Sequence, residues 1–285
     1  MAGLGADSIR ALVFLGLAIV MFIVSKMVKD LTTPYKIDEE LGKSNLAVSI
    51  SLAGYLFATM MVLMAAFFGK DHDLWTDVQN FLIYAVLGIV LLNVARFIND
   101  YVILRKFSNT KELVEDRNAG TGAVEFGTYL ASGLIVAGSI YGEGGGILTA
   151  LAFFALGQLA LILFSFVYDW ITPFDLHHEI EQDNVAAGVA FGGTYIALGI
   201  ILFNGLLGDF TGWAGSLANF GINTAVAFIF LPLVRLTLDK VLLTRIDLNQ
   251  AISQDRNIAV SVVEMAFAVS FALILFSTVD FDIAF

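Results

Sequence analysis

The sequence predicts an all-α polytopic membrane protein with eight transmembrane helices, arranged as two parallel four-helix repeats built from four helical hairpins. Three observations support this expectation. Of the 285 residues, 58% are hydrophobic and only 14% are charged, whereas a soluble domain has about 25% charged residues because its surface faces water. Long apolar runs recur along the chain, and a bilayer core needs about 20 apolar residues of helix. The two halves of the chain also match each other.

The apolar runs predict eight spans, each long enough to cross the hydrocarbon layer. The first span is expected to be retained rather than cleaved, because Lys26 and Lys29 follow its apolar run instead of preceding it. Two connections, 37–43 and 176–182, are amphipathic and predict short helices at the inner interface. The predicted spans are 9–29, 45–69, 79–103, 119–140, 147–168, 185–206, 218–241 and 258–279.

Lys and Arg are distributed unevenly between the two ends of the predicted spans. Thirteen lie in or beside the connections after spans one, three and seven, whereas only Arg10 and Lys70 lie on the other side. Positively charged connections stay on the inner side of a membrane, so both termini are expected on the outer side.

Charge and cysteine content exclude several classes of protein. The net charge of −11 argues against nucleic-acid binding, which needs a basic surface. The chain contains no cysteine, which excludes disulfides, iron–sulfur clusters and thiolate zinc sites. We therefore expect no cofactor and no metal centre.

The chain aligns with itself without a gap at an offset of 139 residues. Polar identities carry the match, and such identities are rare by chance in apolar sequence. The alignment predicts two domains, 1–143 and 144–285, each with four spans. An even number of spans keeps the same orientation, so the halves are expected to be parallel repeats about an axis along the membrane normal. Polar pairs in this match include Asp30/Asp169, Thr33/Thr172, Pro34/Pro173, Glu40/Glu179, Asp116/Asp255 and Arg117/Arg256.

A weaker repeat inside each half predicts that the structural unit is a two-helix hairpin, used four times. The second helix of each hairpin begins with an asparagine: Asn45, Asn118, Asn184 and Asn257. An asparagine at this position can accept hydrogen bonds from the free N–H groups of the first helical turn. Helix capping therefore accounts for these four residues without a further function.

Each half contains a Thr-Pro-aromatic motif, then acidic residues and an asparagine that opens a span, and later an Asp-Arg-Asn motif. These motifs stand at 33–35, 45–47 and 116–118 in the first half and at 172–174, 184–186 and 255–257 in the second. With them, nearly the whole chain resembles bacterial membrane proteins catalogued as domain of unknown function 350, as two fused copies. The resemblance implies a multi-pass protein of the bacterial inner (plasma) membrane, from a family sometimes encoded near stomatin/flotillin-like proteins. In that membrane, the outer side on which the Lys and Arg distribution places both termini is the periplasm. The resemblance implies no catalytic residues.

Ionised residues inside spans are the first candidates for function, because each costs about 2.5–3.5 kcal/mol at the bilayer centre. Each half places an Arg, an Asp four residues later and a Glu on the next helix at similar depths, about 10–12 Å inside. Two interpretations are open: buried Arg–Glu ion pairs completed by the Asp, or an ion pathway lined by acids that are in excess and surround one pseudo-twofold axis. The residues are Arg96, Asp100 and Glu125 in the first half and Arg235, Asp239 and Glu264 in the second.

Three functional classes follow from these features. The first is a small-ion channel or transporter for protons or monovalent cations, which uses the duplicated charges. The second is a membrane-organising or partner-binding protein that works with a stomatin/flotillin-like scaffold through the amphipathic connections. A membrane enzyme is the least favoured class, because the sequence contains no nucleophile–base motif and no complete metal-ligand set. Besides the lipid bilayer, a small cation and a second copy of the chain are the partners that the sequence allows.

Overall fold

The computed structural model describes residues 2–67, 73–104, 106 and 108–278. In this part of the chain, eight helices are long and apolar enough to cross a membrane, which confirms the predicted fold class. Residues 68, 69 and 279 of the predicted spans, and the charges Lys70 and Arg105, lie outside the described residues. The long helices are α1 (Ala2–Thr32), α3 (Leu46–Phe67), α4 (Leu74–Ile98), α6 (Ala119–Ile140), α7 (Ile147–Ile171), α9 (Val185–Asn204), α10 (Trp213–Thr237) and α12 (Ile258–Thr278).

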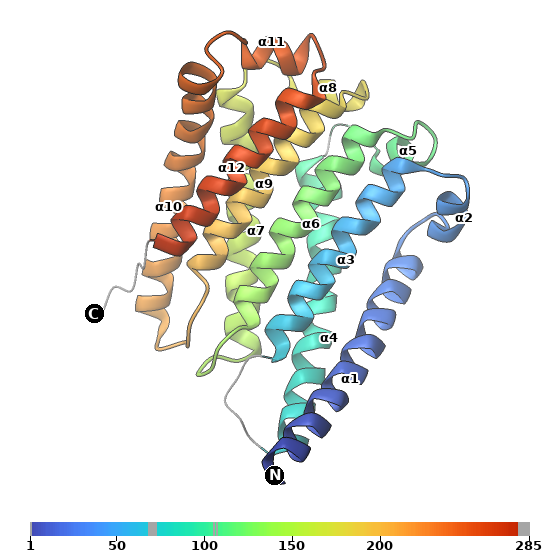
Figure 1. Ribbon diagram of the computed structural model, residues 1–285, viewed down its shortest axis with the longest axis vertical. Coiled ribbons are helices and arrows are strands. Elements are labelled where there is room, and N and C mark those ends of the chain that lie inside the picture. The colour runs from blue at the N-terminus through green and yellow to red at the C-terminus, as the bar shows by residue number, and fades with distance from the viewer. Residues whose placement is uncertain (1, 68–72, 105, 107, 279–285) are drawn as a thin grey trace.

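The second helices of the four hairpins, α3, α6, α9 and α12, pack against one another in chain order (Figure 1). We call these four helices the glycine row. Helices α1, α4, α7 and α10 form a second layer, in which α4 contacts both α3 and α6, α7 contacts α6 and α9, and α10 contacts α9 and α12. Because α9 lies between α6 and α12, the charge clusters of the two halves do not meet around a common axis.

Glycines allow the helices of the row to approach backbone to backbone. A Cβ atom on Gly54 of α3 would lie 2.6 Å from the Cα of Phe126 on α6. Between the two halves, a Cβ on Gly199 of α9 would lie 2.6 Å from the Cα of Ala131 on α6, and Gly127 meets the backbone of Gly192. Small residues drive helix association in membranes because close packing replaces the hydrophobic effect that operates in water. The row is therefore the core of the bundle.

Two Gly-rich turns join helices at the end of the bundle where α1 begins. The first follows α6 and the second follows α9. Gly142 and Gly208 have φ angles of +82° and +108°, which residues with a Cβ rarely adopt. The N–H of Phe210 donates to the Glu143 carbonyl at 2.7 Å, and the Glu143 N–H donates to Asp209 Oδ1 at 2.8 Å. The two turns thus hold each other across the boundary between the halves.

Four short helices lie at the opposite end of the bundle (Figure 1). The sequence predicted two of them, at 37–43 and 176–182, and these correspond to α2 and α8. The other two were not predicted, although they have the same length of six residues. The short helices in the described chain are α2 (Ile37–Gly42), α5 (Asn109–Val114), α8 (Leu176–Glu181) and α11 (Leu248–Ser253).

Each short helix turns into the next row helix through one residue with a positive φ, followed by the asparagine. These residues are Ser44 (φ 58°), Arg117 (φ 53°), Asp183 (φ 54°) and Arg256 (φ 48°). A residue with a positive φ stands at the same place in all four hairpins, which shows that the hairpin is the repeating unit.

The asparagines cap the row helices and also join each hairpin to the next one. Asn118 Oδ1 accepts from the Thr121 N–H at 2.9 Å, while its Nδ2 donates to Glu112 and to the Ile180 carbonyl of the following short helix. The Nδ2 of Asn45 reaches the Leu113 carbonyl in the same way, and that of Asn184 reaches the Ile252 carbonyl. Side-chain capping thus links the four units along the end that carries the short helices.

Replacement of Gly127 by alanine should force α6 away from α9, because the added methyl group would overlap the Gly192 backbone. We expect Gly127→Ala to lower the free energy of unfolding in detergent micelles by about 1–3 kcal/mol. Gly16→Ala on α1 is the matched control, because a Cβ there meets nothing within 4 Å. The control should leave stability unchanged or raise it by up to about 1 kcal/mol. Equal stability of the two variants would contradict close packing of the row.

Candidate functional site

In the second half, the predicted arginine and glutamate meet between α10 and α12. Arg235 Nε donates to Glu264 Oε1 at 2.9 Å, and the two side chains are 11% and 3% exposed. Arg235 Nη2 also donates to Asn249 Oδ1 at 3.0 Å. Two opposite charges removed from water thus neutralise each other through a direct hydrogen bond, as the ion-pair interpretation requires.

The aspartate of each half lies in a π-helical turn that the sequence analysis did not foresee. These turns, Asn99–Ile103 and Leu238–Leu242, directly follow α4 and α10. A π turn inserts an extra residue into the helix and is frequent at functional sites. Asp100 accepts from Asn109 Nδ2 at 2.8 Å, and Asp239 accepts from the Leu248 N–H at 3.2 Å. Each aspartate therefore attaches the end of its helix to the following short helix.

Arg96 differs from Arg235, because it binds the end of α1 and not a glutamate. Its Nη2 donates to the Thr32 carbonyl at 2.8 Å, and its Nη1 donates to the hydroxyls of Thr32 at 2.9 Å and Thr33 at 3.3 Å. Its Nε lies 3.5 Å from Asp100 Oδ2. The last carbonyls of a helix carry partial negative charge and attract a cation. The expected Arg96–Glu125 contact is therefore wrong for the first half: within the described residues, Arg96 pairs with Asp100.

Glu125 is buried beside a cation that the sequence analysis placed elsewhere. Its side chain accepts a hydrogen bond from the Ser51 hydroxyl on α3. Lys29, counted among the charges of the inner connections, is only 2% exposed and donates to the Tyr129 hydroxyl. Its ammonium nitrogen lies 4.5 Å from the ring centre of Tyr129 and 5.2 Å from that of Tyr55. Glu125 and Tyr129 are four residues apart on α6, so they share one face of that helix. We call these five residues the lysine cluster.

Lys29 changes the charge balance of the first half. The sequence analysis counted one base and two acids in each half, which left an acidic excess. With Lys29 beside Arg96, this group of the first half holds two bases and two acids, Asp100 and Glu125, so the excess is absent from it. In the second half, Asp239 is paired with Lys240, whose Nζ lies 2.7 Å away. The expectation that an acidic excess in each half forms a cation site is therefore wrong.

A hydrogen-bonded chain of hydroxyl groups continues from the lysine cluster along α1 and α3. Ser25 Oγ donates to Tyr55 Oη at 2.9 Å and lies 2.9 Å from Thr59 Oγ1. Asn93 Nδ2 on α4 donates to Tyr55 Oη at 3.1 Å. Ser25 and Thr59 are 0% exposed. The first half thus carries a path of polar side chains between α1, α3 and α4.

The second half lacks most of this polar path. Its equivalents at the offset of 139 are apolar or less polar, while the Arg, Asp and Glu are kept. The changes from the first half to the second are Ser25/Phe164, Lys29/Tyr168, Ser51/Ala190, Tyr55/Thr194, Thr59/Leu198, Asn93/Pro232 and Tyr129/Ala268. A cavity of about 10 Å³ remains there beside Tyr168 and Glu264, room for about one water molecule. The Arg, Asp and Glu are therefore shared by both halves, whereas Lys29, Ser51, Tyr55 and Tyr129 are particular to the first.

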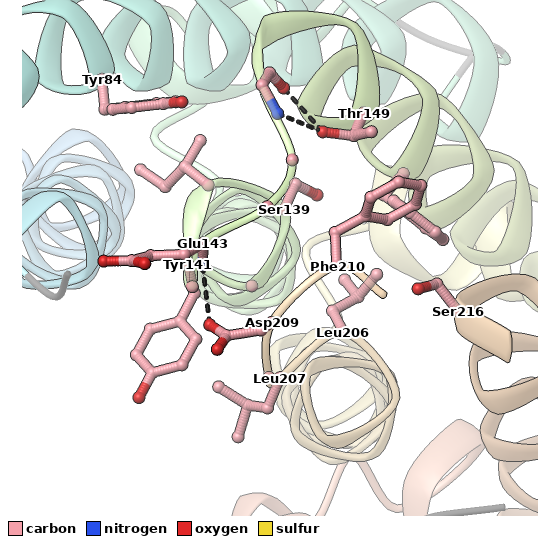
Figure 2. Close-up of a pocket in the computed structure, with 18 of the residues that line it drawn as sticks. Tyr84, Ser139, Tyr141, Glu143, Thr149, Leu206, Leu207, Asp209, Phe210 and Ser216 are labelled. Carbon is pink, nitrogen blue, oxygen red and sulfur yellow. Dashed lines mark hydrogen bonds between the residues drawn. The ribbon is translucent and has the colours of Figure 1, made fainter. Parts of the chain in front are cut away.

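A larger cavity of about 660 Å³ lies at the other end of the bundle, between the Gly-rich turns, α1 and α4 (Figure 2). Figure 2 shows Glu143 and Asp209 on the two turns and Tyr84 across from them. Asp77 adds a third carboxylate and binds Arg10. The lining includes no residue of the lysine cluster. From Tyr84 to Asn93 on α4, the separation is nine residues, a rise of about 13 Å.

Tightly packed helices with charges buried between them define a polytopic membrane protein made of two copies of one four-helix unit. The chain belongs to the family described as Domain of Unknown Function (DUF350), whose model matches residues 3–140 and again 144–279. The chain is also similar to a UPF0719 transmembrane protein of Aquifex aeolicus (strain VF5), with 25% identity over 202 residues that cover 69% of this chain and 73% of that protein. No solved structure matches the chain. The resemblance drawn from the motifs and the two-repeat prediction are thereby confirmed.

The arginine and glutamate are in direct contact in the second half and have separate partners in the first. The coupling free energy between the two side chains should therefore differ between the halves. Glutamine replacement of Arg235 and Glu264, singly and together, should give a coupling free energy above about 1.5 kcal/mol. The matched cycle with Arg96 and Glu125 should give less than half of that value, because each of these residues has other partners. Unfolding in detergent micelles measures both cycles. Equal coupling in the two halves would contradict the described geometry.

Proposed function

We propose that the protein transfers protons, or monovalent cations, across the membrane, and that the lysine cluster is its ionisable centre. The observation that supports this proposal is the burial of Lys29 within a transmembrane helix. Its ammonium group bonds to a tyrosine hydroxyl, and no carboxylate among the described residues makes a direct counter-ion contact with it. Ionisable residues inside membranes are expensive and usually serve transport. A purely structural charge would be expected to bind its counter-ion directly, as Arg235 does.

The arrangement of the cluster suits proton exchange. Lys29 and Glu125 are a base and an acid held apart by hydroxyl groups, since Lys29 bonds to Tyr129 and Glu125 bonds to Ser51. A proton can therefore reside on either residue without the loss of a direct ion pair. The hydroxyls of Tyr55, Ser25 and Thr59 extend the hydrogen-bonded path toward the centre of the bundle. Arg96 stays charged under all ordinary conditions and holds α4 against the end of α1.

The large cavity is the entrance from the side where α1 begins. Its carboxylates, Asp77, Glu143 and Asp209, would concentrate cations near the opening. Between this cavity and the polar path lies a tightly packed layer, in which Gly88 of α4 meets Val62 of α3. The described state is therefore closed, and transfer requires a movement of α4 relative to α3. We place the hinge for this movement of α4 at the π turn Asn99–Ile103.

In the membrane we place the short helices on the cytoplasmic side and both termini in the periplasm. The excess of Lys and Arg at the end with the short helices supports this orientation, and family resemblance supports the bacterial inner membrane. The partner-binding role with a stomatin/flotillin-like scaffold stays a prediction. Flux measurement separates the two functions, because a scaffold-binding protein would pass no ions on its own.

Reconstitution into liposomes with an imposed pH gradient tests the proposed centre. We expect Lys29→Gln and Glu125→Gln to reduce proton flux at least tenfold, because each removes one exchangeable group. Lys29→Arg should reduce flux equally, since an arginine keeps the charge but does not release a proton. Potassium and sodium gradients across the same liposomes distinguish protons from monovalent cations.

Two controls accompany these variants. Lys36→Gln removes a lysine that is 81% exposed and should leave flux unchanged. Glu264→Gln should change stability more than flux, because that carboxylate belongs to the structural pair. Undiminished flux in a folded Glu125→Gln variant would remove the lysine cluster from the mechanism.

A further inference from the structure

The glycine row ends at α12 with an unused hydrogen-bond donor. Asn257 Oδ1 caps α12 by accepting from the N–H groups of Ala259 at 3.1 Å and Val260 at 3.3 Å. Its Nδ2 donates to no described residue, whereas the Nδ2 of the other three asparagines binds the carbonyl of the next short helix. Asn257 is exposed, while Asn45 and Asn184 are 0% exposed.

The outward face of α12 repeats the face by which α6 receives α9. Four residues of α6 lie against the α9 backbone: Gly120, Ala123, Gly127 and Ala131. Their equivalents at the offset of 139 are Ala259, Val262, Ala266 and Ser270, and all four are exposed. All four carry a side chain where α6 has two glycines and two alanines, so a helix packed on this face would lie farther from α12 than α9 lies from α6. Within the described chain, no helix covers this face.

The other end of the row has the matching acceptor. Leu41 is the fifth residue of α2 and is 37% exposed, whereas its counterparts Leu113, Ile180 and Ile252 are 2%, 0% and 0% exposed. The Ile180 carbonyl accepts two hydrogen bonds, from the Asp183 N–H and from Asn118 Nδ2. The Leu41 carbonyl accepts the first of these, from the Ser44 N–H. The second hydrogen bond, which the Ile180 carbonyl receives from an asparagine Nδ2, has no donor for the Leu41 carbonyl among the described residues.

Helices α1 and α3 are also incompletely covered at this end. The α3 residues equivalent to Gly188, Gly192 and Gly199 are Ser49, Ala53 and Met60, and all three are partly or fully exposed. The span of α1 is 11% buried, compared with 44% for its counterpart α7, which also packs against α6 and α4. The end at α1, α2 and α3 thus lacks the neighbours that α7, α8 and α9 find in α6.

We propose that a second copy of this chain occupies these ends, with α12 of one copy packed against α1, α2 and α3 of the next. Within the chain, α6 already makes this set of contacts with α7, α8 and α9. The intermolecular interface continues the row, with Asn257 bonded to the Leu41 carbonyl of the next copy. The flexible Met60 would face the small Ser270. Such a head-to-tail interface builds a ring where the rotation closes and a filament where it does not. The association does not depend on the proposed transport.

Cysteine cross-linking tests the register directly, because the chain contains no cysteine. Ala53 and Ala266 correspond to Gly192 and Gly127, whose backbones touch within the chain. In membranes, mild oxidation should convert most of an Ala53→Cys/Ala266→Cys variant into covalent oligomers, while each single variant stays a monomer on a non-reducing gel. Co-expression of the two single variants should give covalent dimers. The control is Ala53→Cys/Val86→Cys, in which the second thiol replaces Val86 of α4, a residue that is 52% exposed. This variant should not cross-link.

The mass of the unmodified protein in lipid nanodiscs gives a second readout that needs no variant. We expect more than one chain per particle, and a single chain after Leu41→Glu, which places a charge in the interface. Covalent dimers from Ala266→Cys alone would overturn the head-to-tail arrangement, because they require α12 to pack on its own equivalent. A single wild-type chain per particle, together with no cross-link in the double variant, would show that lipid covers both ends.

Discussion

The structure depends on the cost of placing a charge where no water can reach it. Every buried ion must be solvated by the protein, and the two halves solve this problem differently. Arg235 and Glu264 neutralise each other by direct contact. Arg96 instead binds the last carbonyl of α1 and the hydroxyls of Thr32 and Thr33, where the helix end supplies the negative charge. In the same half, Lys29 and Glu125 each bond to a hydroxyl group, of Tyr129 and Ser51 respectively.

Duplication explains how one scaffold can carry both solutions. The row of close-packed helices and the asparagine links repeat in the two halves and maintain the geometry. The second half holds a direct ion pair in an apolar setting, whereas the first half carries Lys29, Ser51 and Tyr129 at the positions of Tyr168, Ala190 and Ala268. A polar cluster in the membrane lowers stability, so its presence in one copy only is consistent with a function that needs one centre per chain.

Fold and repeat were predictable from the sequence, because span length and an ungapped offset are strong signals. The lysine cluster was missed for a physical reason. Polar residues shared by both halves are the visible signal, and shared residues such as Asn118 and Arg235 serve capping and pairing. Lys29 lies three residues from the end of α1, where a lysine normally extends toward the interface. A comparison of the halves for differences, such as Lys29 against Tyr168, would have revealed it. The π turns leave no trace in hydropathy.

The exchange of a proton at Glu125, governed by Lys29, is the central claim of this account. Infrared difference spectroscopy of the protein in lipid, recorded across a pH step, measures the protonation of a buried carboxyl group directly. We predict a carboxyl band that appears with protonation, disappears in Glu125→Gln and shifts in Lys29→Arg. A spectrum that is the same in wild type and Glu125→Gln would contradict the claim, because Glu125 would then hold one protonation state throughout.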